Sequence, residues 1–213
     1  MGRVKNVQAM IILICRYAAY LVVTCCLLST VYGQVIESPD RHIVVHIEPG
    51  EQLRLNLEVD GHNVMRVDSV LLVLTAPAAA KLIPVALHQA SKSVRDTIIP
   101  PVHEKRNRIP DLYNELRLEM QGGWALTVRV FDDGFAYRCE TMLPDSITVG
   151  DEHALFHLSP EDSVWASVVE PRDSVDRFQT SYENQYSHTT PDSLPTGKPI
   201  VLPLVIETKG GGR

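Results

Sequence analysis

The adjacent carboxylates Asp132 and Asp133 form the first pair of residues in this chain that could do chemistry. Two carboxylates held roughly 5–10 Å apart can act as acid and base, or acid and nucleophile, on a glycosidic bond. Adjacent residues of an extended chain point to opposite faces, however, so they rarely converge on one bond. Because Gly134 follows, we interpret the two aspartates as a turn whose side chains cap backbone amides.

The histidines form a second candidate group, in two pairs with a spacing of four residues. His42 and His46 lie on one face of a predicted strand, where this spacing puts them roughly 13 Å apart. That distance is too long for two ligands of one metal ion. His153 and His157 have the same problem if their segment is extended, so we expect all four to be ordinary surface or edge residues.

Aromatic side chains could stack on sugar rings. For Trp124 and Trp165 we favour the alternative, in which they fill the core of a sandwich or its rim. Tyr182 and Tyr186 lie on a polar loop, and for them the sugar-binding and the structural interpretation both stay open. The chain has no nucleophile elbow, zinc-protease motif, phosphate loop or dinucleotide fingerprint.

The elements that must position these residues are strands. Tyr113–Glu140 alternates apolar and polar residues, breaks at Gln121–Gly123, alternates again, and has a second break at Asp132–Gly134. A period of two with glycines between the two runs predicts a half-buried β-hairpin, and the second break lies inside its returning strand.

The same pattern recurs along the chain, and no long segment has helical periodicity. Strands are predicted over 41–47, 53–59, 70–74, 146–149, 154–158, 163–169 and 200–206. The polar, proline-containing segment 91–111 is predicted to be an extended surface connection, and 171–198 a long loop. Short strands with regular turn signals indicate an all-β, antiparallel sandwich.

Residues 1–33 have the layout of a signal peptide. A basic start at Arg3 and Lys5 precedes a long apolar run that ends at Gly33, a small residue suited to cleavage. Arg16 interrupts the run, and the remaining apolar segment 17–33 is near the lower length limit for a membrane helix. The alternative to cleavage is therefore that this segment is retained as a membrane anchor. We therefore predict export, with residues 34–213 as one mature domain.

The mature domain is acidic and has one cysteine. Without residues 1–33 it keeps 17 basic and 26 acidic residues, a formal charge of −9. Such a surface repels phosphate backbones, so we expect no nucleic-acid partner. Cys139 is the one cysteine left, which excludes an internal disulfide. We interpret it as a small buried hydrophobe, because no base adjoins it to activate the thiol.

Five segments carry a family resemblance by their order and spacing. They are Ser38–Asp40, Arg106–Asn107 with Tyr113–Leu116, Val130–Arg138, Tyr182–Tyr186, and Pro203–Glu207 with its glycine turn. Together they resemble the N-terminal domain of glycoside hydrolase family 97 across essentially the whole mature chain.

The resemblance implies a fold and a function. The implied fold is a β-super-sandwich of the galactose-mutarotase-like type, which in the family precedes a catalytic (β/α)8 barrel that this chain does not contain. The implied activity is calcium-dependent hydrolysis of α-linked glucosides or galactosides, in the periplasm or at the surface of a Gram-negative bacterium. The resemblance also assigns Glu183 as a calcium ligand, with the other ligands coming from the barrel. Within this chain alone we favour a solvated loop carboxylate for Glu183, because calcium needs roughly six or more ligands.

Two hypotheses therefore follow. The first is an exported, carbohydrate-associated module that packs on a catalytic barrel, shapes the sugar pocket and is not catalytic alone. The second is an exported, non-enzymatic sandwich that serves in adhesion or assembly. The signal peptide and the strand pattern fit both, whereas the family motifs fit the first.

Overall fold

The computed structural model describes residues 33–76, 81–102, 105–170 and 179–209. The predicted signal peptide, apart from Gly33, lies outside these residues. The compact unit that the structure describes begins at Gly33. A search of the described residues for a helix long and apolar enough to cross a membrane finds none.

Sheet A has five antiparallel strands in the order β1-β2-β3-β4-β9. Their bounds are β1 Gln34–Glu37, β2 Ile43–Glu48, β3 Arg54–Val59, β4 His62–Ala76 and β9 Thr148–His157. β2 shows why the segment forms a strand, because Ile43, Val45 and Ile47 are buried and the residues between them are half-buried. The predicted alternation is confirmed there, whereas the strands predicted at 146–149 and 154–158 are one strand, β9.

Sheet B has four antiparallel strands in the order β5-β6-β7-β8. Their bounds are β5 Ala86–Ile98, β6 Ile109–Met120, β7 Trp124–Phe131 and β8 Gly134–Thr141. β6 and β7 are the predicted hairpin, joined by a turn at Gln121–Gly123, and β8 follows the turn at Asp132 and Asp133.

The prediction that 91–111 is only a connection is wrong. β5 and β6 pair in register from Ser91 to Ile98 and from Ile109 to Leu116, across the segment that was predicted to lack strands. The reason is that β5 is an edge strand exposed along most of its length, so it needs no apolar alternation. Its polar side chains find cross-strand partners instead, as Lys92 does with Glu115 at 3.0 Å.

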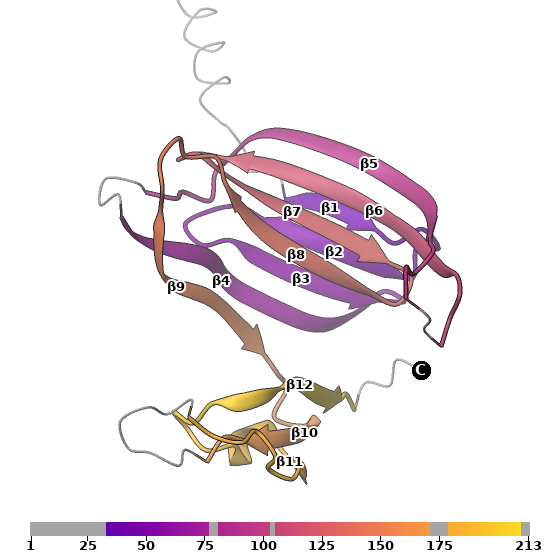
Figure 1. Ribbon diagram of the computed structural model, residues 1–213, viewed down its shortest axis with the longest axis vertical. Coiled ribbons are helices and arrows are strands. Elements are labelled where there is room, and N and C mark those ends of the chain that lie inside the picture. Colours follow the sequence, from indigo (N-terminus) through magenta and orange to yellow (C-terminus); the bar gives the residue numbers. More distant parts are fainter. Residues whose placement is uncertain (1–32, 77–80, 103–104, 171–178, 210–213) are drawn as a thin grey trace, which may run out of the picture. The chain divides into compact units, whose positions relative to one another are not determined.

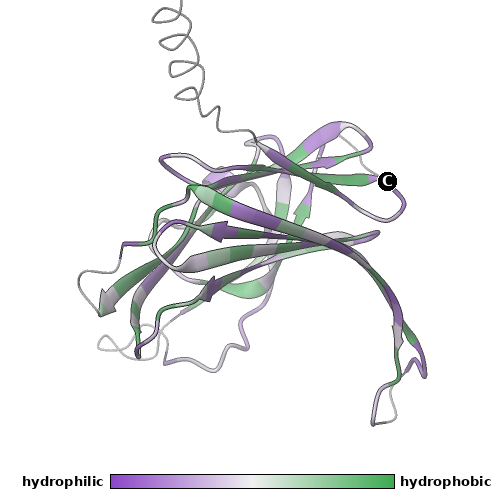
Figure 2. Cartoon of the chain, turned by 90° about the horizontal axis from the view of Figure 1, so that it is seen from above, coloured by the Kyte–Doolittle hydropathy of each residue, from purple (hydrophilic) through white to green (hydrophobic). Residues whose placement is uncertain are grey.

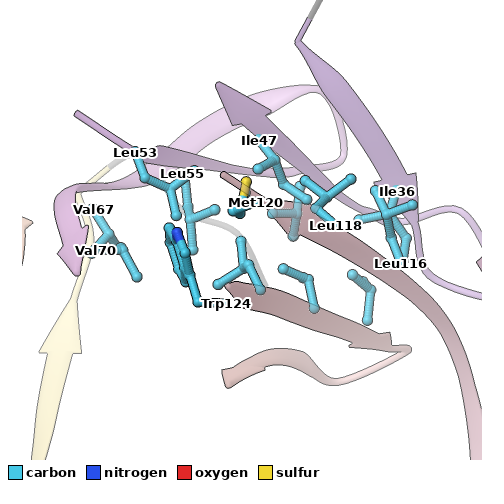
Figure 3. Packing of buried hydrophobic residues seen from close by; sticks show 14 of the residues in the cluster. Ile36, Ile47, Leu53, Leu55, Val67, Val70, Leu116, Leu118, Met120 and Trp124 are labelled. Carbon is cyan, nitrogen blue, oxygen red and sulfur yellow. The ribbon is translucent and has the colours of Figure 1, made fainter. Parts of the chain in front are cut away.

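Sheets A and B face each other across one hydrophobic core, which makes the fold an antiparallel β-sandwich (Figure 1). Apolar and polar residues alternate along the strands in Figure 2. Figure 3 shows Ile47 and Leu55 of sheet A facing Leu118, Met120 and Trp124 of sheet B. These five side chains are at most 1% exposed, and the burial of such side chains is the main source of stability.

Trp124 lies at the start of β7 and is completely buried, which confirms the prediction for this residue. Its indole Nε1 donates a hydrogen bond of 3.1 Å to the carbonyl oxygen of Ile83. The same oxygen accepts the backbone N–H of Val85 at 2.8 Å. The indole therefore supplies apolar area and also connects the start of the hairpin strand to the segment before β5.

Sheet C has three antiparallel strands in the order β11-β10-β12. The strands are β10 Ser163–Val168, β11 Ser187–Thr189 and β12 Ile200–Glu207, and a short 3-10 helix, η1 Pro191–Ser193, lies between the last two. The prediction of a long loop over 171–198 thus holds outside β11 and η1 for the residues that the structure describes. The residues that were predicted to be functional, Tyr182, Glu183 and Tyr186, lie in the segment that leads to β11.

Candidate functional site

Three side chains on three strands of sheet C contact one another. Trp165 of β10 and His188 of β11 are opposite in register, and their rings stack with centroids 4.5 Å apart and planes 12° apart. The indole Nε1 of Trp165 donates to Oε1 of Glu207 at 2.9 Å. His188 Nε2 lies 3.4 Å from Oε2 of the same carboxylate. Glu207 of β12 therefore bridges both rings.

Tyr186 joins this group from the residue before β11. Its hydroxyl donates a hydrogen bond of 3.3 Å to the carbonyl oxygen of Pro203 in β12. Because β10 lies between β11 and β12, the Tyr186 side chain crosses over β10. We use the name aromatic face for the surface formed by Trp165, Tyr186, His188 and Glu207.

The aromatic face remains substantially exposed. Trp165 is 40% and Tyr186 43% exposed, so Trp165, unlike Trp124, lies outside the buried core cluster. On β12, Val205 is 49% and Leu202 80% exposed. Exposed aromatic and aliphatic side chains on one sheet are typical of interaction surfaces.

Glu183 and Tyr182 lie on the segment that leads to β11. Both are exposed, and Tyr182 has a left-handed backbone with φ of 55°. Asn184 anchors this segment to β10, because its Nδ2 donates to the carbonyl oxygen of Val168 at 2.6 Å and its own carbonyl oxygen accepts from Ser167 Oγ at 3.0 Å. The exposed carboxylate of Glu183 is thus carried by a segment with a fixed attachment point.

The described residues contain no group of three or more His, Cys, Asp or Glu side chains that could hold a metal ion. Within this part of the chain Glu183 is one carboxylate, whereas calcium takes six to eight oxygen ligands. It can therefore supply one residue of a larger site. Of the predicted residues, Tyr186 is the one that the structure links to sheet C by a side-chain hydrogen bond, to Pro203 of β12. Trp165 and His188, which contact each other, were not predicted to be functional.

The residues of the aromatic face are far apart in the sequence, so the sequence pattern only weakly indicates that they form one surface. Trp165 and Glu207 stand in different strands, and only the register between β10 and β12 makes them neighbours. His188 lies in a three-residue strand within a polar segment, which has too short a pattern to be recognised.

The other candidates do not form sites. Asp132 and Asp133 form a turn, as predicted, and Asp132 Oδ1 accepts the backbone N–H of Asp40 at 2.9 Å. The turn therefore connects the two sheets of the sandwich. Cys139 packs against the core, and burial raises the pKa of its thiol to about 11, so it is protonated and unreactive at neutral pH.

Each of the four predicted surface histidines contacts a carboxylate instead of a metal site. His42 bonds to Asp60, and this hydrogen bond is the main reason why the pKa of His42 is raised above its ordinary value. His46 contacts Glu58 at 3.3 Å and His153 contacts Asp151 at the same distance. His157 Nε2 lies 2.9 Å from Asp68 Oδ2.

Comparisons with known proteins agree on one relationship. The family described as Glycosyl-hydrolase 97 N-terminal matches residues 36–213. A curated relative, the retaining alpha-galactosidase of Bacteroides thetaiotaomicron, is 25% identical over 185 residues, which are 83% of this chain and 27% of that protein.

Solved structures of a glycoside hydrolase family 97 enzyme from Pseudoalteromonas sp. strain K8, in complex with panose and with acarbose, have the same fold. The TM-score is 0.58 and the sequence identity 19% in both cases, over 74% of this chain and 24% of that chain. This chain therefore spans about a quarter of the length of the relatives that it matches.

Proposed function

This chain belongs to the Glycosyl-hydrolase 97 N-terminal family, and on that premise we propose that it is the non-catalytic β-sandwich module of an exported, calcium-dependent α-glycosidase. Its substrates would be α-linked glucosides or galactosides. The observation that carries the proposal is the family match over 36–213, since it covers nearly all of the sandwich and sheet C. The curated relative is an alpha-galactosidase nearly four times as long as the matched part, which supports a catalytic region elsewhere.

The module would pack on its catalytic barrel through the aromatic face and the neighbouring apolar residues of β12. Trp165 and Tyr186 are large, partly exposed and held by hydrogen bonds, so little side-chain entropy is lost when a partner covers them. Leu202 and Val205 add apolar area that water otherwise covers.

Glu183 would supply one carboxylate to a calcium ion whose other ligands come from the catalytic barrel. Its exposure and the anchoring of the segment by Asn184 support this role, because a ligand offered to another domain must be accessible and held in position. Calcium would then join the module to the barrel and orient the sugar pocket. Tyr182 and Tyr186 flank Glu183 in the sequence and would contact the sugar there.

An adhesion or assembly module remains the second candidate, and one observation favours it. β12 is an edge strand with no charged residue between Ile200 and Ile206, and Leu202 is its most exposed side chain. An apolar edge can pair with a strand of another chain. A self-association that depends on β12 would support this candidate.

The docking proposal is tested by mixing the purified protein with the catalytic region of the Bacteroides enzyme, produced without its own N-terminal quarter and checked for folding by circular dichroism. Calorimetry should detect a complex that Leu202→Asp or Trp165→Ser weakens about tenfold or more. Leu87→Asp is the matched control, because Leu87 is 58% exposed on β5 of sheet B. Equal effects of the Leu202 and Leu87 changes, or no complex at all, would overturn the docking proposal.

A further inference from the structure

The outer face of sheet A, away from the core, contains a groove of about 610 Å³. β2, β3 and β4 lie side by side in Figure 1, and the groove crosses them and the end of β9. Its lining residues are His46, Glu48, Asn56, Glu58, Asn63, Val64, Met65, Arg66, His157, Leu158 and Ser159. The volume lies within the range of pockets that hold small molecules.

A row of four polar side chains crosses the groove from strand to strand. In the pairing register His46 is opposite Asn56, Asn56 is opposite Arg66, and Arg66 is opposite His157. Neighbouring strands lie roughly 4.8 Å apart, so the polar side chains of the row follow one another at about this spacing across the sheet. The row offers donors and acceptors together, since an amide and an imidazole can each do both.

Neighbouring ion pairs hold this row in position. Glu48 accepts a hydrogen bond of 3.0 Å from Asn56 and another of 3.0 Å from Arg54. Arg54 also donates to Asp68 at 2.8 Å, and Asp68 contacts His157 at 2.9 Å.

The Asp68 carboxylate is only 14% exposed. Burial alone would raise its pKa, but the Arg54 hydrogen bond and the charge of Arg66 outweigh this and lower it. Asp68 thus stays ionised and orients Arg54, Arg66 and His157.

The part of the groove just after β9, formed by Leu158 and Ser159, is also held in position by hydrogen bonds. The backbone N–H of Ser159 donates to the buried carboxylate of Asp162 at 3.0 Å, and the N–H of Asp162 donates back to the carbonyl oxygen of Ser159 at 3.0 Å. Leu158, with Val64 and Met65, gives the groove an apolar part.

The charges in and around the groove nearly cancel. Glu48, Glu58 and Asp68 oppose Arg54 and Arg66, and most of their charged atoms are already engaged with one another. No excess of positive charge is left to hold a phosphate, and the one carboxylate charge in excess falls far short of the six to eight oxygen ligands that calcium takes. The chemistry that remains is hydrogen bonding to a neutral ligand with many hydroxyl groups and apolar C–H faces.

We propose that this groove is a binding site for a neutral saccharide, separate from the aromatic face and from Glu183. Asn56 and Arg66 form the hydrogen bonds with sugar hydroxyls, and Met65 and Leu158 contact the ring carbons. The affinity is low, in the millimolar range typical of a few exposed hydrogen bonds, roughly 1 mM. The site shares no residue with the proposed docking surface, so either proposal can fail without the other.

The test is a titration of the ¹⁵N-labelled protein with panose, followed by amide chemical shifts. We expect saturable shifts at residues 46, 56, 66 and 157, and a binding constant about five-fold weaker in Asn56→Ala or Arg66→Gln, as expected for one lost hydrogen bond. Gln89→Ala and Arg108→Gln are the matched controls, because both residues are exposed and lie outside the groove. Unchanged thermal unfolding shows that each variant is folded.

Four outcomes would overturn the proposal, and the first three concern panose and the control variants. They are the absence of saturable shifts with panose, shifts that map to Tyr182 and Tyr186 instead of the groove, and equal weakening in the control variants. A stronger response of the groove to inorganic phosphate or calcium chloride than to panose would also overturn it, because it would replace the neutral ligand with an ion.

Discussion

Replacement of Trp124 should destabilise the sandwich by an amount that the structure predicts. Trp124→Ala removes a completely buried indole, and such changes cost about 3–5 kcal/mol. Trp124→Phe keeps one ring and loses the hydrogen bond to Ile83, worth about 1 kcal/mol. The Ile83 oxygen keeps the Val85 N–H as a donor, so it is not left unsatisfied. With about 1–2 kcal/mol for the smaller apolar volume, the total is about 2–3 kcal/mol.

The assay is urea unfolding followed by far-ultraviolet circular dichroism, with the slope of the transition compared to confirm that the same surface is exposed. Trp165→Phe is the control, since Trp165 is exposed and its hydrogen bond reaches the exposed carboxylate of Glu207. This change should cost less than about 1 kcal/mol. If Trp124→Phe costs no more than Trp165→Phe, the placement of Trp124 in the centre of the core is refuted.

Three further predictions concern a glycine, a thiol and a histidine. Gly122→Ala should lower the unfolding midpoint markedly, because Gly122 has φ of 97° and a Cβ would collide with the carbonyl oxygen of Lys81; an unchanged midpoint contradicts this. Cys139 should react with a thiol reagent at pH 8 only in urea, because its pKa is about 11 in the folded protein; fast labelling of the native protein would refute it. By NMR, His42 should titrate above its ordinary pKa, and in Asp60→Asn its pKa should fall back toward the ordinary value. The stabilisation that the His42–Asp60 pair gives to the folded protein is complete below the unfolded-state pKa of histidine, about 6.5, and is lost as pH rises through the raised pKa of His42. A measured pKa of His42 below its ordinary value would contradict the pairing.

The sequence was sufficient to predict the sandwich and its central hairpin. Period-two alternation marked β2, β6 and β7 because each of them buries one face or both in the core. It could not mark β5, since an edge strand that is exposed on both faces has no apolar period to detect. The pairing of β5 is instead held by its backbone ladder and by contacts such as Lys92 with Glu115.

The candidate site was predictable only in part. Tyr186 was identified from its loop, but its neighbours Trp165 and Glu207 come from strands about twenty residues away on either side along the chain. Long-range register, which depends on the whole sheet, decides such contacts. The saccharide groove has the same origin, because its row of polar residues comes from four strands whose order is set by the fold.

The central claim is that this β-sandwich is a module of a glycosidase and has no glycosidase activity of its own. The most direct measurement is the release of 4-nitrophenol from the aryl α-glucoside and α-galactoside by the purified protein, with calcium and with a chelator. We predict no release above buffer under either condition, because the described residues contain no converging pair of acidic groups at the aromatic face. Clear turnover that co-purifies with the protein and is lost in Glu183→Gln would contradict the account.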